Sequence, residues 1–132
     1  MTRETYRHDI EVQYRDLDPR SHVNHARYVS YLEQAKGEFF REVLETSLAT
    51  ENTAVRHLEL DFRSPIEYDR SVTVALGPVD PGDTSFTIGY EITDGETVAA
   101  TAETVSVLLD DEGRPRSLPE AWHRRMAPYG SG

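Results

Sequence analysis

Residues 24–48 read NHARYVSYLEQAKGEFFREVLETSL and form the long amphipathic stretch of this 132-residue chain. Apolar side chains recur there every three or four positions, which is the spacing of one helix face. They are Tyr28, Val29, Leu32, Ala35, Phe39, Phe40, Val43 and Leu44. Asn24 stands just before this pattern, where a side-chain oxygen can accept a hydrogen bond from a first-turn amide. We therefore expect one long helix from Asn24 to about Leu48.

The flanking sequence alternates between apolar and polar residues, which is the pattern of strands with one buried face. One such segment precedes the helix and four follow it: 6–14, 58–62, 72–76, 86–92 and 98–109. Tight turns such as Asp94-Gly95 join antiparallel neighbours. We expect a single α+β domain over residues 1–132, with an antiparallel sheet of about five strands wrapped around the helix. A short helix near 119–126 and a disordered Gly-Ser-Gly tail should follow the sheet.

The composition excludes several functional classes. Acidic residues outnumber basic ones 24 to 14, giving a net charge of −10, which disfavours binding to nucleic acid or to an anionic membrane surface. The chain has no cysteine, so thiolate nucleophiles and cysteine zinc sites are excluded. It also has no apolar run of the roughly 18–20 residues that a membrane span needs, and no signal-peptide pattern. We expect a cytoplasmic protein.

The basic residues are almost all arginine, and Lys36 is the one lysine among the 14. An excess of carboxylates with few lysines resembles the surface of proteins adapted to high salt, where the repulsion within an acidic shell is screened. The alternative is an ordinary acidic cytosolic protein.

Salt should therefore raise the thermal stability. A net charge of −10 on 132 residues repels itself in dilute buffer, and molar KCl or NaCl should screen that repulsion and raise the melting temperature. Thermal unfolding at two salt concentrations checks this. A melting temperature that salt leaves unchanged or lowers would contradict adaptation to high salt.

Residues 14–29, YRDLDPRSHVNHARYV, place two carboxylates and two imidazoles in a loop that opens the predicted helix. The first turn of a helix presents unpaired N–H groups and a partial positive charge, which suit a developing oxyanion. A nearby carboxylate can act as a general base or as a nucleophile. The loop is therefore the candidate active site.

This loop, together with the helical Glu33-x-x-Lys36, resembles the hotdog-fold acyl-CoA thioesterases of the 4-hydroxybenzoyl-CoA thioesterase-like family. It is similar also to the acyl-ACP thioesterases. The motif lies in residues 14–36, and the expected order of strands and helix fits the hotdog topology over residues 6–110. The resemblance implies hydrolysis of an acyl-CoA thioester to a carboxylic acid and coenzyme A. We expect no cofactor, because coenzyme A is part of the substrate, and we expect no metal.

The resemblance also assigns roles to particular residues. The family's catalytic aspartate falls on Asp18, and the amide that polarises the thioester carbonyl falls near His25. His22 and Asn24 match the H and the first N of the family's H-V-N-N run, and we count both with Asp18 and His25 as the predicted catalytic residues. Glu33 is the reserve catalytic residue, because another hotdog subgroup places its carboxylate on this helix.

The loop departs from the family pattern at three positions. Ser21 replaces the usual glycine, and His25 replaces the second asparagine. Arg20 stands where acyl-ACP thioesterases carry a catalytic asparagine, which favours acyl-CoA over an acyl carrier protein as the source of the thioester. In the helical pair, Lys36 replaces the family's arginine.

Each site residue has a structural alternative. Asp18 precedes a proline and could serve only as an Asx-turn residue. Asp16 is expected to be structural or solvated, and Glu33 could simply pair with a base. Asp18 could also bind a metal together with His22 and His25, although we expect no metal site.

The phosphates of coenzyme A need cations and hydrogen-bond donors. We name Arg63, Ser64 and Arg70 as candidates, with ordinary surface arginines as the alternative. A lone hotdog sheet leaves an open edge, so we expect a homodimer joined edge to edge, and a dimer of dimers, with Asp18 facing the helix of the other chain. Two other functions stay open: an R-specific enoyl-CoA hydratase and a non-catalytic acyl-CoA-binding module.

Overall fold

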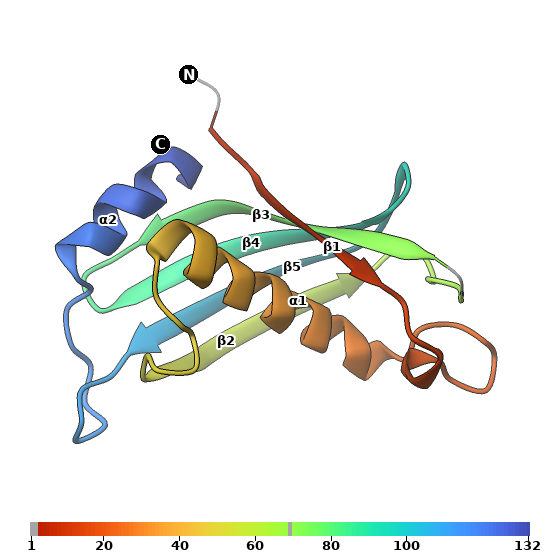
Figure 1. Cartoon of the computed structure of the whole chain (residues 1–132), viewed down its shortest axis with the longest axis horizontal. Coiled ribbons are helices and arrows are strands. Elements are labelled where there is room, and N and C mark those ends of the chain that lie inside the picture. Colours follow the sequence, from red (N-terminus) through yellow and green to blue (C-terminus); the bar gives the residue numbers. More distant parts are fainter. Residues whose placement is uncertain (1–2, 69) are drawn as a thin grey trace.

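The computed structural model describes residues 3–68 and 70–132. Five antiparallel strands form one sheet in the order β1-β3-β4-β5-β2. The strands are β1 (Tyr6–Glu11), β2 (Thr53–Phe62), β3 (Ser71–Pro81), β4 (Ser85–Asp94) and β5 (Thr97–Leu108). The long helix α1 (His25–Phe39) lies across one face of the sheet, and the short helix α2 (Glu120–Met126) covers one end (Figure 1). This confirms the predicted α+β architecture.

Helix α1 begins where the sequence predicts and ends earlier. The Asn24 side chain caps it by accepting a hydrogen bond from the Ala26 amide at 2.9 Å. Regular α-helix stops at Phe39, and one π-helical turn continues to Leu44. Glu45, with φ 56, is left-handed and stops the helical hydrogen-bond ladder, so the prediction of helix to Leu48 was wrong. No helix in the described ranges is long and apolar enough to cross a membrane.

The core lies between α1 and the middle of the sheet. The helix packs on β1 and β3 and turns one stripe of residues inward. That stripe consists of Tyr28, Tyr31, Leu32, Ala35, Lys36 and Phe39. Alternate residues of β3 and β4 face this stripe and are buried, as the period-two pattern predicts.

The edge strand β2 is much less covered. Among the described strands it pairs with β5 alone, so that Leu58 lies opposite Thr104 and Phe62 lies opposite Ala100. Thr104 and Ala100 are buried, so Leu58 and Phe62 lie on the side of the sheet that carries the helix. They are nevertheless 42% and 46% exposed, because α1 sits over the other half of that face.

Strand β1 also ends earlier than predicted. The alternating pattern runs to Tyr14, but the strand stops at Glu11, and Tyr14–Asp16 form a short 3-10 turn. The Asp16 carboxylate holds this turn by accepting a hydrogen bond from the Gln13 amide at 2.9 Å. Tyr14 is therefore 77% exposed and does not share the buried face of the strand.

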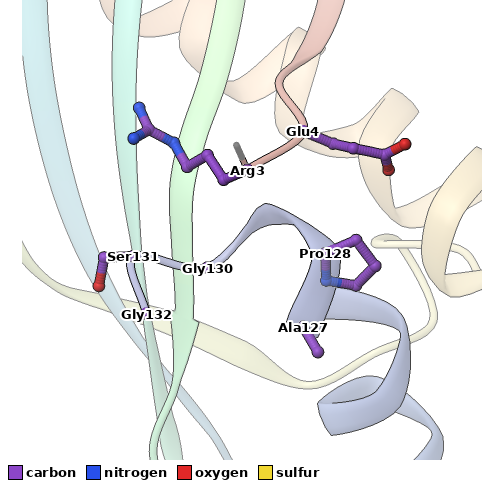
Figure 2. A pocket seen from close by; sticks show the side chains of 7 residues that line it. All are labelled: Arg3, Glu4, Ala127, Pro128, Gly130, Ser131 and Gly132. Atoms are coloured by element: carbon purple, nitrogen blue, oxygen red, sulfur yellow. The ribbon is translucent and has the colours of Figure 1, made fainter. Parts of the chain in front are cut away.

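The two ends of the chain meet at the far end of the molecule from the loop before α1 (Figure 1). The Glu4 amide donates to the Pro128 carbonyl at 2.8 Å. Ser131 donates to the Asp80 carboxylate through its amide and its hydroxyl, both at 2.8 Å. The tail that the sequence predicts to be disordered is thus held on β3, because the Asp80 carboxylate accepts hydrogen bonds from Ser131. Figure 2 shows the cavity of about 510 Å³ that these end segments line.

Candidate active site

Asp18 lies in the loop before α1, where it forms an Asx turn. Its Oδ1 accepts hydrogen bonds from the amides of Arg20 at 2.8 Å and His22 at 3.2 Å. These two donors, Arg20 first, hold the pKa of the Asp18 carboxyl below its usual range, so the group is ionised at neutral pH. Both bonds go to Oδ1, and Oδ2 has no hydrogen-bond partner within residues 3–68 and 70–132. Asp18 thus makes the Asx-turn contacts that its position before a proline predicts, and its second carboxylate oxygen is left for chemistry.

Ser21 takes the backbone conformation that explains the glycine of the family pattern. Its φ is 65, in the left-handed region, and its amide donates to the Asp18 carbonyl at 3.0 Å. A residue with a side chain loses about 1–2 kcal/mol in this conformation, whereas glycine does not. The departure at this position therefore keeps the shape of the loop at some cost in stability.

The first turn of α1 offers a free backbone donor. Asn24 uses its side chain to cap Ala26, and its carbonyl accepts from the Arg27 amide at 2.9 Å. The His25 amide donates to no acceptor among the described residues. It is also at the positive end of the helix dipole, so it is suited to stabilise an oxyanion.

The His25 side chain packs against the end of strand β2. Its ring lies 4.4 Å from the Phe62 ring, centroid to centroid, with a tilt of 33°. Phe62 also meets the Tyr28 ring edge-on at 5.0 Å. These aromatic residues line a cavity of about 260 Å³ together with Arg63, Ser64 and Pro65. The start of the helix and the end of β2 therefore form one aromatic pocket that Arg63 and Ser64 border.

The structure brings two of the three predicted coenzyme A residues to this pocket. Arg63 and Ser64 line it, and both of their amides donate to the Ala99 carbonyl, at 2.8 and 3.1 Å. The Arg63 side chain is exposed and reaches the Thr101 hydroxyl at 3.5 Å. Arg70 does not line the pocket, and its guanidinium lies 4.0 Å from the Asp94 carboxylate.

The Asp18 loop faces a different hollow of the same chain. A cavity of about 340 Å³ is lined by Arg20, Ser21, His22, Glu67 and Tyr68. His22 also forms an isolated β-bridge with Glu67. Within one chain, Asp18 does not line the pocket of the His25 side chain. The predicted site residues are therefore divided between two separately lined hollows.

Glu33, the reserve catalytic residue, pairs with Lys36 on the next turn of α1. The Lys36 Nζ lies 3.1 Å from Glu33 Oε2 and 3.2 Å from Oε1. The lysine side chain is only 3% exposed, whereas that of Glu33 is 45% exposed. Glu33 thus pairs with a buried base, which is the structural alternative that the sequence analysis gave for it.

Asp16 is a buried structural residue, which is one of the two outcomes expected from the sequence. It is 5% exposed, and its Oδ2 accepts a hydrogen bond from the Tyr31 hydroxyl at 2.9 Å. Its Oδ1 lies 3.6 Å from Arg27 Nε. Burial raises the pKa of Tyr31, and the hydrogen bond to Asp16 raises it further, so Tyr31 is a neutral donor. Asp16 therefore ties the loop to the helix.

Sequence reasoning missed Phe62 and Tyr28 as pocket residues. Tyr28 reads as an ordinary core residue, and Phe62 reads as the last apolar position of a strand. The sequence feature that could have identified Phe62 is its position directly before Arg63 and Ser64. This position places an aromatic ring next to the predicted coenzyme A residues.

Comparison with known proteins decides the family. The family model of the thioesterase-like superfamily matches residues 12–126 of this chain. The chain belongs to the thioesterase-like superfamily. This membership confirms the family resemblance, the hotdog fold and the expected class of enzyme, a thioester hydrolase.

Individual thioesterases are similar over nearly the whole chain. The acyl-CoA thioester hydrolase YbgC of Escherichia coli is 28% identical over 122 residues, which cover 88% of this chain and 91% of YbgC. A thioesterase from Thermus thermophilus, solved in complex with coenzyme A and Zn, is 34% identical with a TM-score of 0.85. That alignment covers 96% of this chain and 95% of the Thermus chain. A predicted thioesterase from Bacillus stearothermophilus, 24% identical, shares the fold with a TM-score of 0.86 over 96% and 97% of the two chains.

Proposed function

We propose that this protein hydrolyses acyl-CoA thioesters to a carboxylic acid and coenzyme A. The observation that carries the proposal is the free His25 amide at the capped start of α1, next to the aromatic pocket with Arg63 and Ser64 on its rim. The similar YbgC is an acyl-CoA thioester hydrolase, and the similar Thermus thioesterase was solved with coenzyme A, which supports a CoA thioester as the substrate.

The helix start would stabilise the transition state. Attack on the thioester carbonyl turns its oxygen into an oxyanion, and a well-placed donor contributes about 3–4 kcal/mol to its stabilisation. The His25 amide is free to donate and lies at the positive end of the helix. The exposed Arg63 guanidinium would bind a phosphate of coenzyme A, with Ser64 beside it as a hydroxyl donor.

Asp18 would supply the base or the nucleophile. Its free Oδ2 can take a proton from the attacking water, or can attack the carbonyl itself to form a mixed anhydride that water then hydrolyses. In both routes coenzyme A leaves as the thiol after it takes up a proton. The lowered pKa keeps the carboxylate charged at neutral pH, as either route requires.

The hydratase alternative needs an Asp–His side-chain pair. Here the Asp18 carboxylate bonds to the backbone amide of His22 and to no imidazole within the described residues. A thiol-release assay across short, long and aryl acyl-CoAs tests the proposal, with loss of the crotonyl-CoA enone absorbance as the parallel assay for hydration. Release of free coenzyme A supports it. Hydration without thiol release, or binding without turnover, would contradict it in favour of one of the two alternatives.

We further propose that the active site is completed by a second copy of the chain. Strand β2 is a free edge that exposes Val55, Leu58 and Phe62 to solvent at 45%, 42% and 46%. Long apolar edges are normally covered, whereas the other edge, β1, is a short strand with outward charges at Arg7 and Asp9. Pairing of two β2 edges would bury the apolar side chains. It would also bring the Asp18 loop of one chain toward the helix of the other.

The protein should therefore be a dimer or tetramer at micromolar concentration. Light scattering measures the mass, and Leu58→Glu should shift it toward the monomer and abolish thiol release, because a charge at a paired apolar edge opposes association. Thr93→Glu, at a half-buried position on the opposite face, is the control that should keep the parent mass. A compact monomer with full activity would contradict the shared site.

A further inference from the structure

The sheet face turned away from α1 carries a cluster of metal-ligating side chains on the edge strand β2 and its neighbour β5. Glu59 on β2 and Glu103 on β5 are direct cross-strand partners. Glu103 precedes the buried Thr104, so it points to the opposite, solvent-facing side. His57 lies two residues before Glu59 and so shares that side. The register of the sheet therefore places an imidazole and two carboxylates on one face of neighbouring strands.

The two carboxylates lack a neutralising base. Like charges directly opposite one another destabilise a sheet. Within residues 3–68 and 70–132, no lysine or arginine forms an ion pair with Glu59 or Glu103. The near partner of Glu59 is His57, whose Nε2 lies 3.8 Å from the Glu59 Oε2. A cation held by all three side chains would remove the repulsion.

The geometry fits a small divalent ion. The three ligand atoms lie within 4.8 Å of one another. Tetrahedral zinc with bonds of about 2.1 Å needs its ligand atoms about 3.4 Å apart, which these exposed side chains can reach by moving about 1 Å each. A hollow of about 180 Å³ next to the cluster, lined in part by Asp61 and Thr101, leaves room for a water ligand.

We propose that His57, Glu59 and Glu103 form a zinc site that clips the edge strand β2 to β5. The imidazole nitrogen favours zinc over calcium and magnesium, which take oxygen ligands. Three protein ligands leave the fourth position to water. Strand β2 pairs with β5 alone among the described strands of this chain and carries Phe62, on which the His25 ring packs. The metal would therefore steady the strand that forms one wall of the aromatic pocket.

Calorimetric titration of the tag-free, metal-stripped protein with zinc chloride tests this proposal. We expect one zinc ion per chain and a melting temperature that rises with zinc, because a ligand that binds only the folded state stabilises it. His57→Gln and Glu103→Gln should each weaken zinc binding by at least ~10-fold. All three side chains are exposed, so these variants should fold normally.

Two control variants separate a built site from general attraction to an acidic surface. Glu91→Gln removes one charge from the same sheet face, and His123→Gln removes an imidazole elsewhere, and neither should change the zinc affinity. Cobalt provides a second readout, since ligation by His57 should give visible absorption that His57→Gln removes. The proposal is overturned if zinc does not bind, if the cluster variants bind as tightly as the parent, or if Glu91→Gln weakens binding as much as Glu103→Gln.

Discussion

Replacement of Asp18 by asparagine should lower thioester turnover by at least ~10²-fold, the usual effect of losing a general base. The fold should survive, because the Asn Oδ1 can still accept the hydrogen bonds from the Arg20 and His22 amides. Substrate binding should change little, since the proposed coenzyme A contacts lie at Arg63 and Ser64. Steady-state thiol release, with kcat and KM measured separately, checks this expectation.

The pH profile gives the same test a second readout. The active form of Asp18 is the carboxylate, and amide donors hold the pKa of that group below its usual range. The rate should therefore hold as the pH falls through the ordinary aspartate range and should decline only below it. In Asp18→Asn this acid limb should disappear from whatever activity is left.

Two further variants identify which group carries out catalysis. His25→Ala should be much milder than Asp18→Asn, because the proposed oxyanion donor is a backbone amide that the substitution leaves in place. Glu33→Gln should also be mild, since Glu33 acts as the counter-ion of Lys36. A collapse of activity in Glu33→Gln with Asp18→Asn active would move catalysis onto the helix. Parent rates in both carboxamide variants would show that neither acid is catalytic.

Replacement of Asp16 by alanine should have the largest effect on stability, a loss of about 2–4 kcal/mol. The buried carboxylate accepts hydrogen bonds from the Gln13 amide and the Tyr31 hydroxyl, both at 2.9 Å. Removing it leaves two donors without a partner, and Tyr31 is itself only 3% exposed. Chemical denaturation measures the loss.

Tyr31→Phe provides the matched test of the Asp16 contact. If the two side chains act through one hydrogen bond, the double variant should lose less stability than the sum of the single losses. Asp111→Ala, which removes an exposed carboxylate, should stay within about 0.5 kcal/mol of the parent. A loss below about 1 kcal/mol for Asp16→Ala would show that the loop does not depend on this contact.

In strand β5, the local sequence pattern was insufficient to predict which residues face the helix. The sequence shows a run of apolar residues at Val98, Ala100 and Ala102 that continues through Val105 and Val107. Such a run changes face midway along a strand. The side toward the helix in fact carries Thr104 and Ser106, both buried. The hydroxyl of Thr104 lies 3.2 Å from the Tyr90 hydroxyl on β4, so a partner far along the chain makes a polar residue acceptable in the core.

The sequence alone determined the features that neighbouring residues decide among themselves. The three-to-four spacing from Tyr28 onward predicts α1, and Asn24 predicts its cap, because both depend on contacts within one or two turns. The order of strands and the loop around Asp18 also indicated the family, since the motif is contiguous in the chain.

Tertiary structure decided what depends on which elements meet. It placed α1 over β1 and β3, which left the apolar side of β2 uncovered. It placed the Asp18 loop and the His25 side chain at two separate hollows, although the two residues are close in sequence. It also added Phe62 to the pocket and set Glu59 opposite Glu103. The physical reason is that burial and strand pairing join residues far apart in the chain, so no local spacing encodes them.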